Sequence, residues 1–291
     1  MSWRVVVVSS CAKLELKTSY LVIRTENDIK KIHLSEMSVL IIESTAVSIT
    51  AALLCELTRS RIKVIFCDEK RNPQSELVNY YGSHDTSLKI RNQIDWKSVT
   101  KQQVWTEIIR EKISNQYRVL KDLGCEEMNL LEGYIQELQF NDSTNREGHA
   151  AKVYFNAVFG KSFTRTHDNS INAGLNYGYA IILSVFNREI VANGYITQLG
   201  LFHDNMFNEF NLSCDLMEPF RQIIDKKILT MNYEEFGHNE KMEILNVLND
   251  EVKIDGKSQY VSNAIRIYSK SVLDALNEND ISLIRFMKYE L

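Results

Sequence analysis

Three short segments in the second half of the chain bring acidic side chains and one histidine into otherwise apolar surroundings. Glu147 lies in the first segment, His203 in the second, and Asp215 and Glu218 in the third. Carboxylate oxygens with a single imidazole suit Mg²⁺ or Mn²⁺ better than a structural zinc ion, which prefers several Cys or His ligands. If the segments converge on one cation, the chemistry that they favour is metal-dependent phosphoryl transfer.

Glu147 also has an ordinary explanation. Thr144 followed by Glu147 is the pattern of a capping box, in which the Glu side chain returns to the backbone amide of the N-cap residue. However, a carboxylate in the first turn of an apolar helix, beside the open space that Gly148 leaves, is also well placed to hold a cation. The spacing does not separate these two interpretations.

The third segment is equally open. Asp215 and Glu218 are three residues apart, so a continuous helix would place both carboxylates on one face. Two like charges that close repel unless a cation or an arginine lies between them. Alternatively, Asp215 is an N-cap and Glu218 its capping-box partner, with Pro219 in the first turn. A lone histidine such as His203 is commonly a hydrogen-bonded structural residue, and that explanation also stays open.

The formal charge of −4 argues against a protein that coats nucleic acid through bulk positive charge. A local basic groove remains compatible with it, because Arg146, Lys152, Lys161 and Arg165 lie close together in the sequence around Glu147. The alternative for these four is a solvated helix face and loop. The sequence contains no Walker loop, nucleophile-elbow serine, paired-cysteine zinc site or dinucleotide-binding glycine fingerprint.

The secondary structure that must position these residues is predicted to change along the chain, from strands in the N-terminal part to helices after it. Alternating and β-branched runs predict strands over residues 5–8, 13–17, 20–23, 29–34, 39–42 and 63–67, with one helix near 47–57. An apolar stripe from Trp105 to Leu123 then predicts a long helix, with Gly124 as its C′ residue. Further helices are expected over 128–138, 146–158, 172–191, 217–229, 241–248 and 260–276.

We therefore expect an α+β chain, with a small β-rich N-terminal domain followed by a larger all-α C-terminal domain. The predicted divisions are a β-rich domain over 1–82, a polar linker over 83–100 and a helical catalytic domain over 101–291. The β-rich domain has strand edges to protect, and two-fold association is the commonest way to bury them, so we expect it to mediate a homodimer.

The cysteines and the apolar runs bear on the cellular compartment. The five cysteines are scattered without metal-ligand spacing, which is typical of buried, reduced thiols in a cytoplasmic protein. No apolar run approaches the ~18 residues that a membrane span needs, and residues 5–8 are too short for a signal peptide. A cytoplasmic chain without a membrane partner is expected.

Four segments in this order and spacing resemble the CRISPR-associated integrase family, the catalytic subunit that inserts new spacers during CRISPR adaptation. The chain is most similar to members from loci whose effector is a single RNA-guided nuclease, and the resemblance extends over essentially its whole length. The segments are Glu147–Gly148 with Lys152–Phe155, Asn172–Tyr179, Gly200–His203 and Asp215–Arg221.

The resemblance implies a function and a set of roles. Glu147, His203 and Glu218 would bind Mg²⁺ or Mn²⁺, with Asp215 as a supporting acid. A 3′ hydroxyl of the incoming DNA would attack a phosphodiester of the repeat array, in an assembly of two homodimers joined by a small CRISPR-associated partner dimer. The side chains implied to position double-stranded DNA through its phosphates are Arg146, Lys152, Lys161, Arg165 and Arg221.

Two alternatives belong to other functional classes. One is a non-catalytic DNA-binding scaffold with a degenerate site, which the presence of all four acidic or imidazole residues argues against. The other is a general metal-dependent DNA nuclease acting in repair, which would use water as its nucleophile. The same metal geometry serves water and a 3′ hydroxyl, so the sequence leaves the second alternative open.

Overall fold

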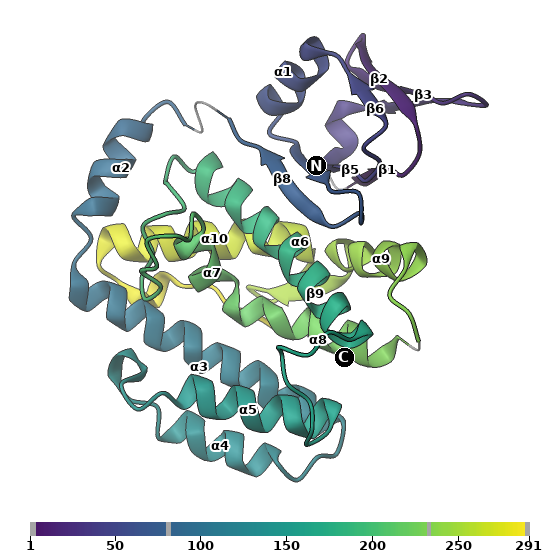
Figure 1. Ribbon diagram of the computed structural model, residues 1–291. Helices are drawn as coiled ribbons and strands as arrows, with labels where there is room; N and C mark the ends of the chain where they lie inside the picture. Colours follow the sequence, from purple (N-terminus) through teal and green to yellow (C-terminus); the bar gives the residue numbers. More distant parts are fainter. Residues whose placement is uncertain (1–3, 80–82, 232–233, 289–291) are drawn as a thin grey trace.

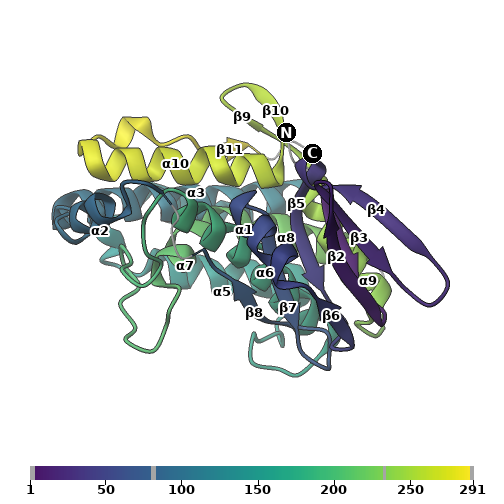
Figure 2. The ribbon, with the colours of Figure 1, turned by 90° about the horizontal axis from the view of Figure 1, so that it is seen from above.

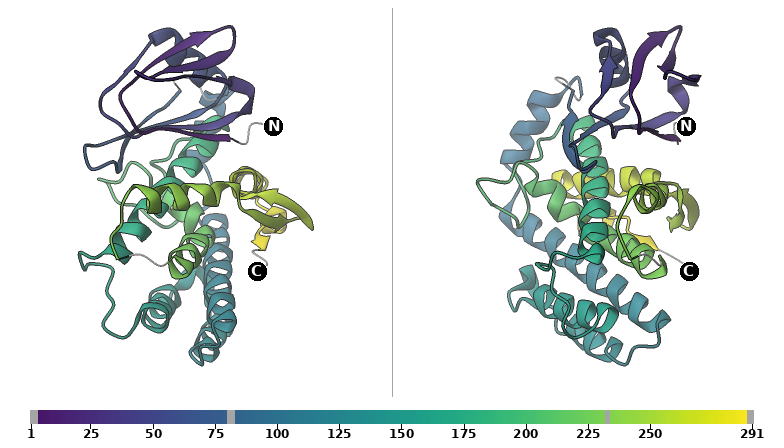
Figure 3. Two further views of the ribbon diagram at one scale, coloured as in Figure 1. Left: turned by 90° about the vertical axis from the view of Figure 1, so that its right-hand side faces the viewer. Right: turned by 45° about the vertical axis from the view of Figure 1, so that its right-hand side comes forward.

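The computed structural model describes residues 4–79, 83–231 and 234–288. Its β-rich part precedes its helical part, and Figures 1 and 3 show the two parts one above the other. The predicted α+β class is confirmed. The β-rich part contains β1 (Arg4–Val8), β2 (Ala12–Lys17), β3 (Tyr20–Arg24), β4 (Ile29–His33), β5 (Met37–Ile42), β6 (Val47–Ile49), α1 (Ala51–Arg59), β7 (Lys63–Cys67) and β8 (Pro73–Leu77).

These strands form two four-stranded sheets. One has the order β1-β5-β7-β8, in which β1, β5 and β7 are parallel and β8 is antiparallel to β7. The other has the order β4-β3-β2-β6. Strand β8 was not predicted, because its sequence is polar and begins with proline. Both properties suit an edge strand, where one side of the ladder stays unpaired.

Strand β5 divides its side chains between two cores. All six of its residues are buried, as expected for a strand inside a parallel sheet that is covered on both faces. Leu40 and Ile42 pack into the core of the β-rich part, whereas Val39 and Ile41 join the core of the helical part. Because side chains alternate between the two faces of a strand, β5 packs against both cores and connects the sheet to the helices. Arg188 of α6 adds a hydrogen bond across this contact, from Nη1 to the Ser38 carbonyl at 2.9 Å.

The helical part follows the expected periodicity closely. Its helices are α2 (Thr86–Ile94), α3 (Ser98–Asp122), α4 (Met128–Gln136), α5 (Arg146–Phe159), α6 (Ser170–Ala192), α7 (Asn211–Met217), α8 (Arg221–Thr230), α9 (His238–Leu245) and α10 (Val261–Glu278). Helix α3 ends as predicted, with Gly124 in the left-handed region at φ +69°. Helices α3, α4 and α5 form the end farthest from the two large sheets (Figures 1 and 3).

Several expectations need correction. The C-terminal part is not all-α, since β9 (Glu251–Ile254), β10 (Lys257–Tyr260) and β11 (Met287–Lys288) form a small sheet beside α10 (Figure 2). Residues 83–100, expected to be a linker, hold α2 and the start of α3. The division at residue 82 stays a prediction, because Gly82 lies outside the described residues. Cys11 and Cys55 are exposed rather than buried.

The predicted helix over 217–229 is the correction that matters most for the site. Helix α7 ends at Met217, a single 3₁₀ turn covers Glu218–Phe220, and α8 begins at Arg221. Pro219 lies within this turn, and proline removes a donor from the backbone hydrogen-bond ladder. Asp215 therefore lies in α7 and Glu218 in the 3₁₀ turn that follows it, where the hydrogen-bond pattern of the helix changes. Among the described residues, no helix is long and apolar enough to cross a membrane.

Gly178 tests the packing of α6 against α8. A Cβ at this position would lie 2.4 Å from Cγ2 of Ile224, so Gly178→Ala should lower the free energy of unfolding by about 1 to 3 kcal/mol. Chemical denaturation measures this change. Ile224→Ala removes the opposing side chain, so in that background the additional cost of Gly178→Ala should be smaller than in the unaltered protein.

Gly133 in α4 is the matched control. A Cβ there meets no atom within 4 Å, so Gly133→Ala should be neutral or stabilising by up to ~1 kcal/mol through helix propensity. Equal effects of the two alanine substitutions would contradict the close approach of α6 and α8.

Candidate metal centre

Helix α5 presents Glu147 because another residue caps it. Both oxygens of the Asp142 carboxylate accept backbone N–H groups, Oδ1 from Arg146 at 2.7 Å and Oδ2 from Glu147 at 3.0 Å. The predicted capping box with Thr144 is therefore wrong, and the Glu147 side chain is not used in capping. The space beside Gly148 is not open either, since a Cβ there would lie 2.9 Å from Asn145 Oδ1.

The Glu147 carboxylate instead meets a buried lysine. Lys112, from the middle of α3, forms an ion pair with Glu147, and its Nζ also lies 2.5 Å from Glu218 Oε2. Two carboxylates that are 71 residues apart in the sequence are therefore neighbours around one ammonium group. Burial alone would lower the pKa of Lys112, but the charges of Glu218 and Glu147 raise it above its ordinary value.

Sequence reasoning missed Lys112, although a signal was present. Lys112 follows Ile109 by three residues and precedes Ile113, so it falls on the apolar stripe of α3 rather than on its solvent face. Its side chain is only 7% exposed. A lysine on the buried face of an amphipathic helix requires a carboxylate partner, and here it has two.

Glu218 is held in its ionised form by its cationic neighbours. Burial, the largest influence, would raise its pKa, but Arg221 and Lys112 lower it to about 2. Arg221 Nε donates to Glu218 Oε1 at 2.9 Å. The other oxygen, Oε2, is buried and faces the Lys112 ammonium as an ion pair, without a well-directed hydrogen bond from the described residues. That oxygen retains the capacity to bind a cation.

A buried aromatic residue supports Arg221 from behind. The Arg221 guanidinium lies 4.7 Å from the centroid of the Tyr179 ring, and the Tyr179 hydroxyl donates to Asp225. Burial raises the pKa of the Asp225 carboxyl to about 6, against the effect of the Tyr179 hydrogen bond. Arg221 was expected to contact DNA. In the structure its guanidinium is directed at Glu218, where it fixes a carboxylate oxygen.

Asp215 organises the segment that carries His203. Its fully buried carboxylate accepts the backbone N–H groups of Leu201, Phe202 and His203 at 2.6, 3.2 and 3.1 Å. Gly200 permits this close approach, because a Cβ there would lie 2.3 Å from the His203 carbonyl oxygen. Asp215 lies inside α7, so it is not an N-cap, and the interpretation of Asp215 and Glu218 as a capping box is wrong.

The same carboxylate orients the imidazole. His203 Nδ1 lies 2.6 Å from Asp215 Oδ1, and because the carboxylate accepts, Nδ1 carries the proton. In the neutral ring, Nε2 is then the nitrogen that can act as a metal ligand. The hydrogen bond to Asp215 raises the pKa of His203, and the charge of Glu218 raises it further, so the imidazole lies within electrostatic reach of Glu218.

The four residues fit a divalent cation in part. A monovalent cation, the Lys112 ammonium, already lies between Glu147 and Glu218, and Glu218 Oε2 and His203 Nε2 are donors of the required kind. However, no group of three or more His, Cys, Asp or Glu side chains in residues 4–79, 83–231 and 234–288 is arranged to hold a metal ion. Convergence of Glu147, His203 and Glu218 on one cation therefore stays a prediction.

The predicted basic residues fall into two groups. Lys152 and Lys161 are exposed, on α5 and just after it. Arg146 forms an ion pair with Glu137 at 2.7 Å, and Arg165 donates to Asn176 Oδ1 at 2.6 Å. The two arginines therefore already have protein partners. Their role as DNA contacts, like that of the lysines, stays a prediction.

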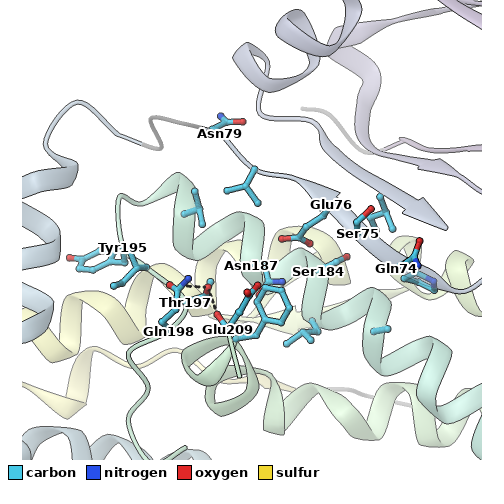
Figure 4. Close-up of a pocket in the computed structure, with 18 of the residues that line it drawn as sticks. Gln74, Ser75, Glu76, Asn79, Ser184, Asn187, Tyr195, Thr197, Gln198 and Glu209 are labelled. Atoms are coloured by element: carbon cyan, nitrogen blue, oxygen red, sulfur yellow. Dashed lines mark hydrogen bonds between the residues drawn. The ribbon is translucent and has the colours of Figure 1, made fainter. Parts of the chain in front are cut away.

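A cavity of about 640 Å³ lies elsewhere, between β8 and α6 (Figure 4). Its lining includes Glu76, Asn187 and Glu209, and none of the described residues that line it belongs to the ion-paired set around Lys112. Thr197 Oγ1 donates to the Glu209 carbonyl at 2.7 Å at this wall (Figure 4). The cavity therefore borders the segment before α7 without containing the carboxylates.

Comparison with known proteins identifies the family. The family model described as "CRISPR associated protein Cas1" matches residues 5–251. The chain belongs to the Cas1 family. It is 34% identical over 236 residues to the CRISPR-associated endonuclease Cas1 of Neisseria meningitidis serogroup C (strain 8013), a match that covers 81% of this chain and 77% of that protein. The predicted family is confirmed, and with it membership of a family of CRISPR-associated endonucleases and integrases.

Solved structures agree on the fold. A casposase bound to integration product has a TM-score of 0.76 at 16% identity, with 97% of this chain and 93% of that chain covered. A chain of a Cas6-RT-Cas1–Cas2 complex has a TM-score of 0.74 at 15% identity, and the match covers 99% of this chain but only 36% of that longer chain. At identities of 15% and 16%, these similarities show that this chain shares the fold of the two structures.

The His203–Asp215 pair makes stability depend on pH in a defined direction. Because the pKa of His203 is raised in the folded protein, its protonated form stabilises the fold fully below the ordinary value of 6.5, and this contribution is lost as the pH rises through the raised value. The destabilisation caused by Asp215→Asn should therefore be larger at about pH 5 than at about pH 9, as measured by urea denaturation.

The control tests Asp215→Asn in a variant that lacks the His203 imidazole. In the background of His203→Ala, Asp215→Asn still replaces one of the two oxygens that accept the three amides with an NH₂ donor, but its cost should be the same at both pH values. A pH-dependent cost that persists in this background would assign the effect to another group.

Proposed function

We propose that this Cas1 family member joins DNA strands by metal-dependent transesterification, inserting new spacer DNA into a CRISPR repeat array. The observation that supports this most is the meeting of Glu147 and Glu218 around one buried positive charge, on elements that the fold holds together. A cation bound there would be Mg²⁺ or Mn²⁺, held by Glu147, Glu218 and His203. When bound, it would neutralise charge on the reacting phosphodiester and align the attacking and leaving oxygens.

The chain's own residues have separable roles in this proposal. Arg221 keeps Glu218 ionised and oriented through its hydrogen bond to Oε1. Asp215 fixes the tautomer of His203, so that in the neutral ring the lone pair is on Nε2, the nitrogen that would bind the cation. A 3′ hydroxyl of the incoming DNA serves as the nucleophile, and no protein side chain forms a covalent intermediate.

The proposed partners are DNA, a second copy of the chain and a small protein, and the proposed compartment is the cytoplasm. The two DNA substrates are double-stranded, the spacer and the repeat array, and the protein acts on them in the cytoplasm. A spacer has two ends and each subunit offers one site, so a homodimer is proposed, with the β-rich part as its contact. The Cas6-RT-Cas1–Cas2 complex, which contains a chain of the same fold, also contains Cas2, and we propose a small partner of that kind here as well.

Strand joining with purified protein is the test. His203→Ala and Glu218→Gln should each reduce joining of a 3′-hydroxyl DNA to a repeat-bearing plasmid by at least ~100-fold, because they remove stabilisation of transition-state charge. DNA affinity should change little, since phosphate contacts supply most of it. Glu132→Gln, an exposed carboxylate on α4, is the matched control and should join at the rate of the unaltered protein.

The products decide between the proposal and its alternatives. Joined products from the unaltered protein that disappear in the His203→Ala variant support transesterification. Cleavage without joining, in the presence of a 3′-hydroxyl donor, would favour a nuclease that uses water. Binding without either reaction in Mg²⁺ and in Mn²⁺ would favour the non-catalytic scaffold.

Lys152 and Lys161 provide a test of the DNA surface. Substituting both with alanine should weaken binding to all sequences alike and reduce the dependence of the logarithm of affinity on the logarithm of salt concentration, because each phosphate contact contributes ~0.9 to that slope. Affinities across a salt series measure it. Lys270→Ala, which removes an exposed lysine paired with Asp274 on α10, is the control. An unchanged slope in the double variant would assign Lys152 and Lys161 to a solvated face.

A further inference from the structure

Lys112 has no part in the proposed reaction, yet it is buried between two of the carboxylates at the site. Its side chain is 7% exposed, and it contacts both carboxylates that the proposed cation would require. Neighbouring groups on α3 fix its surroundings. Asn115, one turn further along, donates from Nδ2 to the Pro219 carbonyl at 2.9 Å, which ties α3 to the turn that carries Glu218.

An ammonium group and a divalent cation cannot both occupy the space between these carboxylates. Each is held there by the same negative charges, and the two repel each other at contact distance, where a low local dielectric strengthens the repulsion. Glu218 has a second cationic partner, Arg221, on its other oxygen. Glu218 therefore stays oriented if Lys112 leaves, whereas Glu147 exchanges one cation for the other.

We propose that Lys112 is a placeholder cation for the metal centre, which holds Glu147 and Glu218 together before the metal binds and is displaced when it does. Lys112 is in this role a positioning residue. It prevents the repulsion of two carboxylates in the metal-free protein, and it lowers the affinity for the divalent cation because its own ion pairs must be broken first. This inference rests on the proposed metal-dependent function.

Mn²⁺ binding by the full-length protein tests the exchange without any measurement of activity. Lys112→Met keeps most of the side-chain volume without the charge, and Lys112→Gln keeps a donor without the charge. Both variants should bind Mn²⁺ at least about tenfold more tightly than the unaltered protein in calorimetric or electron paramagnetic resonance titrations, because no ammonium competes. Both should also melt at a lower temperature without metal and recover when Mn²⁺ is saturating.

Lys63 offers a matched control. It is also buried and also forms an ion pair with a carboxylate, that of Glu76, but it lies on β7 in the β-rich part. Lys63→Met should lower the melting temperature in the same way as Lys112→Met. It should leave Mn²⁺ affinity unchanged, which separates loss of a buried ion pair from loss of a competing charge.

A second measurement uses the unaltered protein and so does not depend on the variants folding. Acetylation of lysine amines, followed by mass spectrometry, should find Lys112 protected without metal and reactive at saturating Mg²⁺. Lys63 should stay protected in both conditions.

The outcomes distinguish this inference from the proposed function. If the unaltered protein binds Mn²⁺ and the Lys112 variants bind it equally or more weakly, or if Lys112 stays protected at saturating Mg²⁺, the placeholder role is overturned and the metal centre stands. If neither the unaltered protein nor the Lys112 variants bind Mn²⁺, the proposed metal-dependent function itself fails.

Discussion

The burial of Glu218 among cationic side chains is the constraint on which the rest of the site depends. Removing one partner from a buried ion pair typically costs ~3 to 5 kcal/mol, because the remaining charge is left without compensation. Lys112 and Arg221 must therefore be held at contact distance of Glu218, and they come from α3 and α8. The packing of these helices is thus fixed by charge as well as by apolar area, and the position of Glu147 on α5 follows from the same lysine.

Two acidic residues three positions apart, Asp215 in α7 and Glu218 in the 3₁₀ turn between α7 and α8, have different partners. On a continuous helix, Asp215 and Glu218 would share one face and repel each other. Here separate partners compensate the two charges: Asp215 accepts from the amides and imidazole of the preceding segment, whereas Glu218 forms ion pairs with Lys112 and Arg221. Asp215 orients His203 and Glu218 is available as a ligand for a cation, and the proposed mechanism requires both roles.

The sequence allowed much of this to be predicted where the signal was local. Strand β7 and the end of α3 at Gly124 follow from periodicity and backbone preference. The pairing of His203 with Asp215 lies within two neighbouring segments, whereas metal binding by Glu147, His203 and Glu218 stays a prediction. Lys112 and Asp142 were missed because their roles depend on contacts with residues outside their own segments. The 3₁₀ turn at Pro219 was missed because proline is also tolerated in a first helical turn. Strands β8, β10 and β11 were missed because they are short and lack an apolar alternation, and β9 because its alternation spans only four residues.

A crystal structure of the protein soaked in Mn²⁺ would test the metal centre most directly, because the anomalous signal locates the ion independently of any assay. The account predicts an anomalous peak between Glu147 and Glu218, at ~2.0 to 2.3 Å from a carboxylate oxygen of each and from His203 Nε2, with Lys112 Nζ moved out of that space. A fully occupied Mn²⁺ elsewhere, with Lys112 still between the two carboxylates in protein that joins DNA, would contradict it.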